Sequence, residues 1–360
     1  MKILCLIDSL GQGGAEHQII CLTNMLKQAG YDVELASYYR ENFYLSQINQ
    51  YGIKWSMIPC VGEKRFVRIK RIRDFIKNNE YTHLITYKDG ASQIGCLLKI
   101  GGLKIRLIVS ERNTSQSLNF SNKLKFFLYR WADYVIPNSF SQKSFICKHF
   151  PNLERKTIAI TNYVDKEVYE PKGKTYANSK TPVAILVAGR ISRQKNVFGF
   201  MKAIELIREK GTEIQVNWFG NVDTNETDYG REVFEYYRSS ELKSCLTFHS
   251  ATIDIVSEYH KCDVFCLPSL FEGCPNVIYE AMSSGAPILC SNVCDNPQIV
   301  KDGINGYLFN PLNPANMADV IIRFCGLDAD KKKQMSQKSI EIADEMFSSS
   351  AFISKYISLL

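Results

Sequence analysis

The fold of this chain is decided by the stretch LPSLFEGCPNVIYEAMSSGAP, which runs from Leu267 to Pro287. Its first residues end an apolar run, which predicts a buried strand that stops at Pro268. A short loop follows, and Pro275 suits the first position of a helix. A glycine at position 285 and the proline after it stop that helix about three turns later. The stretch therefore predicts a strand, a loop and a helix, in the order typical of parallel α/β sheets.

The same alternation of β-branched runs and helical patterns continues outward in both directions. In the first half we expect strands at Ile3–Ile7, Val33–Tyr38, Ile53–Ile58, His83–Thr86, Arg106–Ser110, Tyr134–Pro137 and Thr157–Ile160. In the second half we expect them at Val183–Ala188, Ile214–Phe219, Leu246–Phe248, Val264–Leu267 and Ile288–Cys290. Such alternation predicts parallel sheets with crossover helices.

The chain divides into two domains, because the alternation pauses once. We expect a first Rossmann-like domain over 1–165 and a second over 183–345, joined by a polar linker at 166–182. The segment 346–360 is apolar on one face. We expect it to form a helix that packs back on the first domain.

Composition and cysteine usage favour a globular protein of the reducing cytosol. With 360 residues, of which 45% are hydrophobic and 22% charged, the chain can bury a sizeable core. Its twelve cysteines form no Cys-x-x-Cys motif, and scattered buried thiols are typical of a reducing cytosol. The apolar run at 3–7 is too short for a signal peptide. No apolar stretch reaches the length that a membrane span needs.

Positive charge is concentrated in the first half. Residues 1–165 carry 23 Lys and Arg against 13 Asp and Glu, whereas the whole chain has a net charge of +7. This asymmetry indicates that the first domain faces something anionic, either a membrane surface or nucleic acid. No nucleic-acid motif accompanies the charge, so we expect no nucleic-acid partner.

Two glutamates eight residues apart mark the predicted loop and helix. Glu272 and Glu280 follow the carboxyl end of a parallel strand, where open α/β sheets bind ligands. Carboxylates so placed can accept hydrogen bonds from hydroxyl groups, and the helix N-terminus offers N–H groups to a phosphate. Two glutamates alone are more often solvated charges at a helix end.

Two cations follow another strand of the same half. Arg190 and Lys195 lie just past the strand Val183–Ala188 and can offset the negative charge of a departing diphosphate. A divalent metal is the usual alternative, but the Asp-x-Asp motif of the chain, at Asp328 and Asp330, lies beside three lysines at the start of a late surface helix. We therefore expect fixed cations and no metal, although in isolation the two residues could be a solvated basic loop.

A glycine-rich loop follows the first strand. Gly13 and Gly14 allow a ligand to approach the backbone closely. The loop is not a dinucleotide fingerprint, because Glu16 stands where the third glycine would be. Alone, the loop is a weak signal.

Together these motifs identify a family: the chain resembles the large retaining GT-B glycosyltransferases often called family 4, over nearly its whole length. The resemblance implies an α/β chain with two Rossmann-like domains facing across a cleft. Its motifs are Gly13-Gly14-Ala15-Glu16, Ser110-Glu111-Arg112-Asn113, Asn138-Ser139, Asn162-Tyr163-Val164-Asp165, Gly189-Arg190, Gln194-Lys195-Asn196, Phe271-Glu272-Gly273, Glu280-Ala281-Met282, Gly285 and Gly303-Ile304-Asn305-Gly306.

The resemblance implies roles for the residues that match these motifs. Glu280 would accept hydrogen bonds from the ribose hydroxyls of a nucleotide sugar, and Glu272 would contact the donor sugar. Arg190 and Lys195 would hold the diphosphate, which Gly13 and Gly14 would face. Donor contacts along the sugar and diphosphate are expected from the backbone of Gly273, Cys274, Pro275, Asn276 and Val277.

The resemblance also implies a mechanism. Similar enzymes retain the anomeric configuration, and the usual proposal is attack from the face of the leaving group. The leaving phosphate itself then takes the proton of the acceptor hydroxyl, so no general base is required. The resemblance implies no cofactor.

One position departs from the family. Many relatives carry a histidine that contacts the donor sugar where this chain has Arg112. Arginine cannot act as a general acid or base at ordinary pH. Arg112, with its neighbour Asn113, can contact a phosphate or an acidic acceptor, and a structural ion pair is an equally good interpretation.

Two stretches of the first domain combine basic and apolar residues. Arg65, Arg68, Arg71 and Arg73 interleave with apolar residues at helical spacing, and 124–131 is rich in aromatics beside basic residues. A basic amphipathic helix can dock on an anionic bilayer. An ordinary surface helix with its apolar face in the core is the alternative.

The sequence therefore predicts a cytoplasmic, peripherally membrane-bound, metal-independent transferase. We expect it to move a hexose or N-acetylhexosamine from a nucleotide diphosphate sugar, UDP-linked, to a lipid-linked surface glycan. Alternatives are a GDP- or ADP-sugar transferase, an epimerase of the same architecture, and a catalytically silent membrane-associated scaffold.

Overall fold

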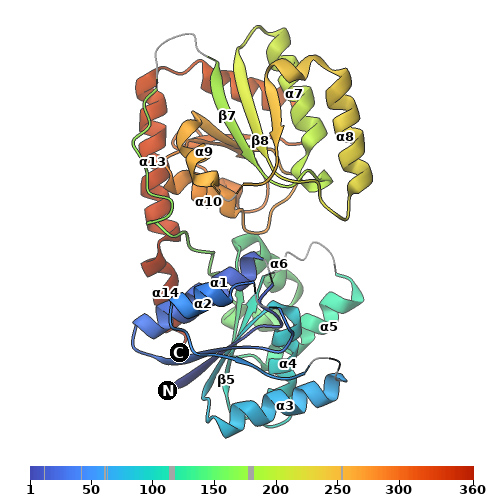
Figure 1. Ribbon diagram of the computed structural model, residues 1–360, viewed down its shortest axis with the longest axis vertical. Coiled ribbons are helices and arrows are strands. Elements are labelled where there is room, and N and C mark those ends of the chain that lie inside the picture. The colour runs from blue at the N-terminus through green and yellow to red at the C-terminus, as the bar shows by residue number, and fades with distance from the viewer. Residues whose placement is uncertain are drawn as a thin grey trace. The chain divides into compact units, whose positions relative to one another are not determined.

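A computed structural model describes every residue except 12, 42, 61, 63, 113–117, 177–181 and 253. The chain forms two compact units (Figure 1). The first comprises Met1–Asn162 with Ser350–Leu360, and the second is the continuous segment Tyr163–Ser349.

The first unit is built on a six-stranded parallel sheet with the order β3-β2-β1-β4-β5-β6. Its strands are β1 (Lys2–Leu6), β2 (Asp32–Ser37), β3 (Trp55–Met57), β4 (His83–Tyr87), β5 (Arg106–Glu111) and β6 (Tyr134–Pro137). Its helices are α1 (Gly14–Gln28), α2 (Leu45–Gln50), α3 (Arg65–Asn78), α4 (Lys88–Ile100), α5 (Phe120–Leu128), η1 (Tyr129–Trp131), α6 (Phe140–His149), η2 (Pro151–Lys156) and α14 (Ser349–Ile357).

The second unit repeats this plan with the order β12-β11-β10-β7-β8-β9, again parallel throughout. Its strands are β7 (Val183–Ala188), β8 (Ile214–Phe219), β9 (Leu246–His249), β10 (Val264–Leu267), β11 (Ile288–Ser291) and β12 (Gly306–Phe309). Its helices are η3 (Arg193–Lys195), α7 (Val197–Glu209), α8 (Thr227–Ser239), η4 (Glu241–Ser244), α9 (Ile255–Lys261), α10 (Asn276–Ser283), α11 (Asn296–Ile299), α12 (Pro314–Cys325) and α13 (Ala329–Phe347).

Both faces of each sheet are covered, as the apolar strand sequences require. In β7, Ile185 and Val187 pack into a core with residues of α7 and α12, whereas Leu186 and Ala188 pack into a second core with residues of α10 and α13. Successive side chains of a strand point to opposite faces, so one strand contributes to both layers. The expectation of two Rossmann-like parallel sheets is confirmed.

Two strand predictions differ from the structure. No strand forms at 157–160, where Thr157 follows η2 and makes only an isolated bridge to Val135. Conversely, β12 was not expected, because its four residues include a glycine. A Cβ atom at Gly306 would lie 1.8 Å from the carbonyl oxygen of Ile288, so only glycine permits this pairing with β11.

The chain returns to the first unit at its end. The predicted boundary at residue 346 lies inside the last turn of α13, and the chain turns at Ser348 before α14. In α14, Phe352 and Tyr356 are buried within the first unit. The polar segment expected as a linker belongs in part to the second unit, where Lys174 Nζ donates to the carbonyl oxygen of Tyr259 at 2.7 Å.

Candidate functional site

The strand order of each sheet reverses once, and this marks the ligand edge. In the second unit the reversal lies between β7 and β10, which are neighbours in the sheet. Ligands of open α/β sheets bind beyond the carboxyl ends of the strands at such a point. The loop after β7 carries Arg190 and Lys195, and the loop after β10 carries Glu272. The topology thus gathers the three residues predicted to be catalytic.

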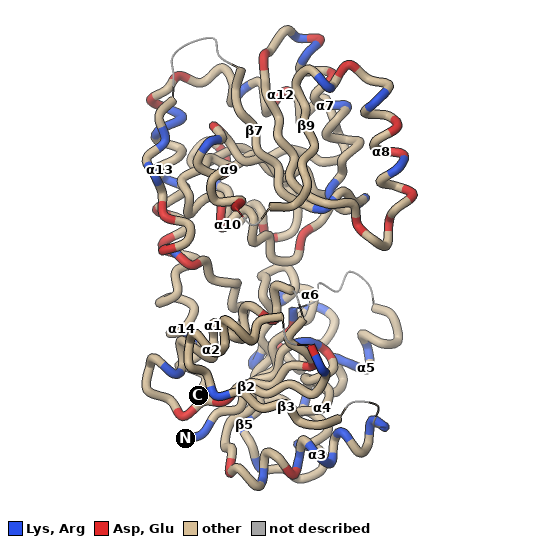
Figure 2. The backbone as a smooth tube through the Cα atoms, viewed as in Figure 1, with Lys and Arg blue, Asp and Glu red and all other residues tan. Residues whose placement is uncertain are grey.

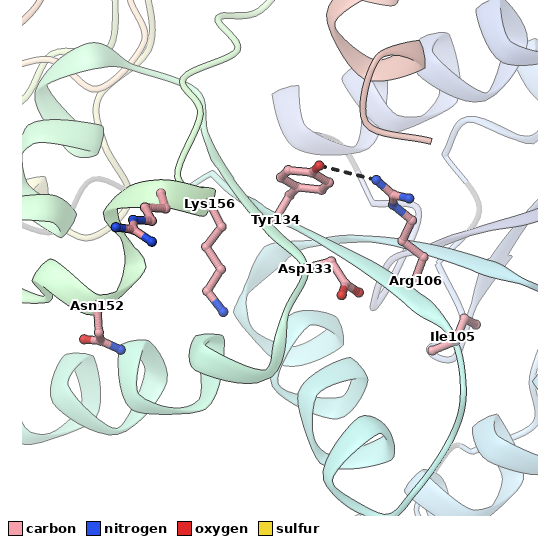
Figure 3. A pocket seen from close by; sticks show the side chains of 7 residues that line it. Ile105, Arg106, Asp133, Tyr134, Asn152 and Lys156 are labelled. Atoms are coloured by element: carbon pink, nitrogen blue, oxygen red, sulfur yellow. Dashed lines mark hydrogen bonds between the residues drawn. The ribbon is translucent and has the colours of Figure 1, made fainter.

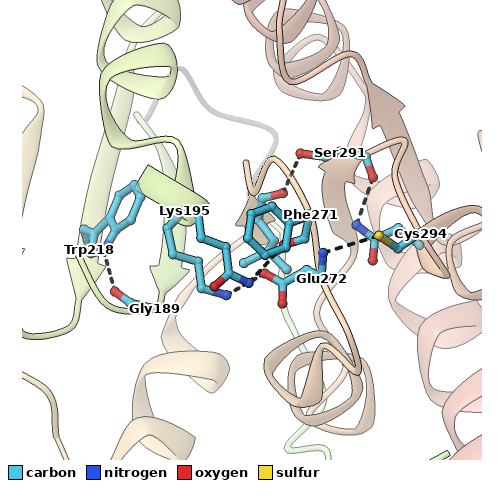
Figure 4. A network of polar contacts seen from close by, with 10 residues as sticks. Gly189, Lys195, Trp218, Phe271, Glu272, Ser291 and Cys294 are labelled. Carbon is cyan, nitrogen blue, oxygen red and sulfur yellow. Dashed lines mark hydrogen bonds and ion pairs between the residues drawn. The ribbon is translucent and has the colours of Figure 1, made fainter. Parts of the chain in front are cut away.

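Lys195 and Glu272 form an ion pair across these two loops (Figure 4). Lys195 Nζ lies 2.5 Å from Glu272 Oε1, and the two side chains are only 14% and 8% exposed. Burial from water strengthens this attraction. The pair places a positive and a negative charge side by side at the ligand edge.

Arg190 is held differently. Its guanidinium pairs with Asp223 Oδ2 at 2.6 Å, and its side chain is 62% exposed. Asp223 lies in the loop after β8, and its own side chain is mostly buried. Sequence reasoning missed Asp223, because only the pairing of β7 with β8 brings it beside Arg190.

Hydrogen bonds to backbone carbonyls join the loop after β7 to the loop after β10 and anchor its base. Gln194 Nε2 donates to the carbonyl oxygen of Phe271 at 3.0 Å, and the Gln194 carbonyl accepts from Leu270 N at 2.8 Å. At the base of the first loop, Trp218 Nε1 donates to the carbonyl oxygen of Gly189 at 2.8 Å. These hydrogen bonds hold the loop that carries Arg190 and Lys195 against the loop that carries Glu272.

Asn196 begins α7 but does not cap it through its side chain. The residue has a φ of +55°, in the left-handed region, and its side-chain amide donates to the carbonyl oxygen of Pro311 at 2.8 Å. Left-handed residues other than glycine are uncommon, and asparagine is among the more tolerant. The contact with Pro311 therefore holds Asn196 in this conformation directly before α7.

Glu280 lies on α10 and is joined to two tyrosines. Its Oε2 accepts a hydrogen bond of 2.9 Å from the hydroxyl of Tyr259, and a second comes from Tyr169. Burial raises the pKa of Glu280 above its ordinary value, and the two hydroxyl donors offset part of that rise. Nothing in the sequence pointed to the tyrosines, which lie outside the motif.

The segment 273–277, which leads into α10, is partly exposed to solvent. Gly273, Cys274, Asn276 and Val277 are half-buried and Pro275 is buried. The helix begins at Asn276 and not at Pro275, because the ψ of 75° at the proline is not helical. Half-exposed backbone at the start of α10 can contact a ligand, as the resemblance implies.

In the first unit the glycine loop precedes α1. Gly13 is the residue before the helix, which begins at Gly14, and its carbonyl accepts from the hydroxyl of Tyr44 at 3.2 Å. The buried Glu16 carboxylate is paired with Lys88, which also lies 3.2 Å from Asp8. Lys88 directly follows β4 and has a φ of +67°. Sequence reasoning missed Lys88, because it lies in none of the motifs that the chain shares with the family.

Arg112 is part of a hydrogen-bonded cluster inside the first unit. Its NH2 group donates to the hydroxyls of Tyr87 and Tyr356, each at 2.7 Å, and its NH1 group donates to Asn162 Oδ1 at 2.8 Å. The guanidinium also lies over the Tyr87 ring, 4.2 Å from its centre. These contacts favour a structural role for Arg112, while Asn113 lies outside the described residues.

A second buried network lies next to this cluster. Glu111 is completely buried and accepts from Lys125 Nζ at 3.0 Å and from the hydroxyl of Tyr129 at 2.8 Å. Burial raises the pKa of Glu111, and the charge of Lys125 opposes that rise. Both networks stabilise the carboxyl end of β5.

The four arginines predicted as a membrane face lie on α3 (Figure 2). Arg65 donates to Gln93 at 2.9 Å, Arg73 donates to the Gly101 carbonyl at 3.0 Å, Arg71 contacts the Pro59 carbonyl, and Arg68 lies over the ring of Tyr39. The apolar residues Ile72 and Ile76 are buried in the core. The burial of Ile72 and Ile76 favours an ordinary surface helix with its apolar face in the core.

The helix α5 exposes more large apolar side chains than α3, on which Phe66 is 74% exposed. Phe120, Leu124 and Phe127 are 83%, 49% and 47% exposed. Arg130 lies over the Phe127 ring, 4.7 Å from its centre. Beside this face is a hollow of about 370 Å³ lined by Leu118, Lys123, Phe126, Phe127, Arg130, His149, Phe150 and Asn152.

A larger hollow of about 820 Å³ lies at the amino ends of β5 and β6, which is the edge of the first sheet opposite to its ligand edge (Figure 3). Among its basic residues, Lys156 donates to the carbonyls of Arg130 and Ala132, and Arg106 donates to Tyr134. Its carboxylate, Asp133, is paired with Lys99. These side chains serve the fold, and the hollow lies away from the ligand edge.

The Asp-x-Asp motif has a structural explanation. Asp328 caps α13, and its Oδ1 accepts a hydrogen bond of 2.7 Å from Lys331 N.

In the described part of the chain, no helix is both long and apolar enough to cross a bilayer.

The second unit matches a family described as "Glycosyl transferases group 1" over residues 182–326. An uncharacterized glycosyltransferase of Haemophilus influenzae is 26% identical over 354 residues, which span 94% of both chains. The UDP-Gal:alpha-D-GlcNAc-diphosphoundecaprenol alpha-1,3-galactosyltransferase of Escherichia coli is 30% identical over 175 residues, 47% of this chain and 45% of the relative.

A solved structure is similar in fold over nearly the whole length of the chain. Anabaena Alr3699/HepE, solved in complex with UDP, has a TM-score of 0.83 and 19% identity, with 99% of both chains covered. At this identity the likeness shows the fold, which is GT-B.

Proposed function

We propose that this protein, a glycosyltransferase of the group 1 type with the GT-B fold, transfers a hexose or N-acetylhexosamine from a UDP-sugar to a lipid-linked glycan. The observation that carries the proposal is the Lys195–Glu272 pair, with Arg190 on the same loop as Lys195, at the reversal between β7 and β10. This arrangement combines positive charge for a diphosphate with a carboxylate for sugar hydroxyls.

The donor would lie along the second unit. Glu280, eight residues after Glu272, supplies an acceptor for ribose hydroxyls, and Tyr259 and Tyr169 fix its carboxylate. The half-buried backbone at 273–277 would lie along the sugar and diphosphate. The Anabaena protein was solved with UDP, which supports UDP as the nucleotide.

The chemistry needs electrostatic stabilisation above all. The bond between the anomeric carbon and the diphosphate oxygen breaks, and its electron pair stays on the diphosphate. Lys195 and Arg190 would offset that charge, which is largest in the transition state. The acceptor hydroxyl attacks from the same face, and its proton passes to the leaving phosphate oxygen. The configuration is then retained, and no metal is required.

The lipid-linked acceptor has support from one relative and one surface. The Escherichia coli relative acts, by its name, on a diphosphoundecaprenol-linked sugar. The exposed apolar face of α5, flanked by Lys123 and Arg130, is suited to an anionic membrane surface. We propose α5 as the main membrane contact and the α3 arginines as a secondary one.

A donor screen tests the proposal. The full chain is incubated with UDP-, GDP- and ADP-sugars and a lipid-diphosphate glycan acceptor, and products are read by mass. We expect one UDP-sugar to add a single sugar residue whose anomeric configuration, read by NMR, matches that of the donor. Transfer from a GDP- or ADP-sugar would correct the nucleotide, and the absence of transfer from every donor would contradict the function.

A further inference from the structure

Cys294 has a backbone conformation that is unusual for its residue type. Its φ is +51°, in the left-handed region that favours glycine. Of the described non-glycine residues, Glu80, Lys88, Asn196 and Cys294 have a positive φ. Glu80 follows the end of α3, whereas the other three lie after the carboxyl ends of strands at the ligand edges: Lys88 is the first residue of α4 after β4, and Asn196 and Cys294 lie in the segments that follow β7 and β11. Strained residues of this kind cluster at functional sites.

The turn that contains Cys294 is held firmly on both sides. Asn296 is completely buried, and its side-chain amide donates to the carbonyl oxygen of Ser291 at 2.9 Å. Before the cysteine, Asn292 N donates to the carbonyl oxygen of Phe309 at 2.7 Å. The surrounding contacts therefore impose the unusual backbone conformation on Cys294.

The turn directs the sulfur toward the candidate site (Figure 4). Glu272 N donates a hydrogen bond to Cys294 Sγ at 3.5 Å. The carboxylate of the same glutamate is held by Lys195 at 2.5 Å. Glu272 is thus restrained at its backbone from β11 and at its side chain from β7.

We propose that Cys294 is a positioning residue, whose sulfur fixes the backbone of Glu272 so that its carboxylate meets the donor sugar in one orientation. The inference rests on the proposed function, in which Glu272 contacts that sugar. It also explains why a strained cysteine stands where glycine would fold more easily.

A thiol suits this task because it remains neutral. Cys294 is exposed, and the partial burial of its thiol raises the pKa of that group; the Glu272 N–H lowers the pKa, while the charges of Asp295 and Glu272 raise it. The protonated sulfur accepts the backbone N–H without repelling the nearby carboxylate. An oxygen, smaller and on a shorter bond, would reach Glu272 N less well.

The proposal predicts opposite effects on stability and on turnover. In C294G the strain is relieved, so we expect a Tm above that of the wild type by about 2 °C. Without the sulfur, we expect kcat with the UDP-sugar identified in the screen to fall by about fivefold to tenfold. C294A should lose a similar factor, and C294S should lie between C294A and the wild type. A purely structural residue would move stability and turnover together.

Binding of UDP separates positioning from general damage. UDP has no sugar, so its Kd should stay within about twofold of the wild type in all three variants. A matched control is C147A, in the half-buried cysteine of α6 in the first unit, which should leave kcat unchanged. If C294G does not fold, the C294S and C294A pair carries the comparison.

Two results would overturn the inference. If the wild type is active and C294G and C294A retain kcat within about twofold, the sulfur does not position Glu272, and the proposed function is unaffected. If the wild type is inactive with every donor, the proposed function fails and the inference with it.

Discussion

The hydroxyl of Tyr259 lies 2.9 Å from Oε2 of Glu280, to which it donates a hydrogen bond, although β10 separates α9 from α10 in the chain. Because Tyr169 donates to the same carboxylate, two neutral hydroxyls hold a charge that burial disfavours. Glu280 therefore has a raised pKa, and this has a measurable consequence for stability.

The first prediction concerns E280Q. In the folded state the ionised form of Glu280 is less favoured than in the unfolded state, because the folded pKa is the higher of the two. Its destabilising effect is complete above the folded pKa, fades as the pH falls through it, and is absent below the ordinary glutamate range. We expect the free energy of unfolding of E280Q, relative to wild type, to rise as the pH increases above about 4.5, the ordinary value for a glutamate.

Denaturant unfolding at several pH values measures this difference. E345Q, at an exposed position on α13, is the matched control and should show no such trend. A difference between E280Q and wild type that does not vary with pH would contradict the raised pKa.

The second prediction separates Lys195 from Arg190. Under the proposed function, R190A and K195A should each lower turnover on the order of 10²- to 10³-fold. Their effects on stability should differ. K195A leaves Glu272 buried and uncompensated, at a cost of about 3 kcal/mol. R190A removes the exposed partner of its pair, and the buried Asp223 keeps the hydrogen bonds that Asn225 donates, so the cost should be smaller, about 1 kcal/mol.

Urea unfolding and initial rates, measured on the same preparations, test both statements. K202A, in an exposed lysine of α7, should change neither quantity. Turnover of R190A or K195A within a few fold of the wild type would rule out the assignment of a diphosphate contact to that residue.

The third prediction concerns α5. The double variant F120S/F127S removes two exposed rings without changing the charge. Burial of one such side chain is worth about 1.5–3 kcal/mol, so binding to phosphatidylglycerol-containing vesicles should weaken by at least about tenfold in sedimentation assays. Transfer to a water-soluble acceptor should persist.

The comparison variant is R65A/R71A on α3, which removes two positive charges. Its loss of vesicle binding should be smaller and should vanish at high salt. If this variant loses more than F120S/F127S, α3 is the membrane face. If neither variant differs from the wild type, the membrane is not a partner of these helices.

The fourth prediction concerns the proposed metal independence. EDTA should leave turnover unchanged, because the diphosphate charge would be offset by side chains. D328A should cost about 1 kcal/mol of stability through loss of the α13 cap, with no effect on turnover. Loss of activity with EDTA that Mg²⁺ or Mn²⁺ restores would refute the proposal, whereas recovery after simple removal of EDTA would point to an unspecific effect.

Local sequence predicted the fold well, and it selected residues that the topology brings to one edge of a sheet. Strands such as β7 and β10 are continuous apolar runs, so their places follow from pattern alone. Glu272, Arg190 and Lys195 could be chosen because each follows such a strand, and the parallel topology brings these loops to one edge. Their roles in catalysis remain predictions.

The contacts that hold those residues could not be predicted in the same way. Asp223, Tyr259 and Cys294 contact Arg190, Glu280 and Glu272, but each belongs to a different loop or helix, and none lies in a motif. Pairing of this kind depends on three-dimensional packing. The strand β12 was missed for a related reason, since a glycine lowers strand propensity unless a neighbour approaches closely.

The cluster around Arg112 has a consequence for how the protein is made. Arg112 is bonded to Tyr356, which the ribosome adds 244 residues later, and the same tyrosine hydroxyl lies 3.1 Å from Ser110 Oγ. When residues 1–162 have left the ribosome, Tyr356 has not yet been synthesised, so the interior of the first unit is still incomplete. The second unit, being uninterrupted, has all its parts before the first one does. The earliest segment to leave the ribosome is thus the last to be completed, and its exposed polar interior must be kept from wrong partners until α14 arrives.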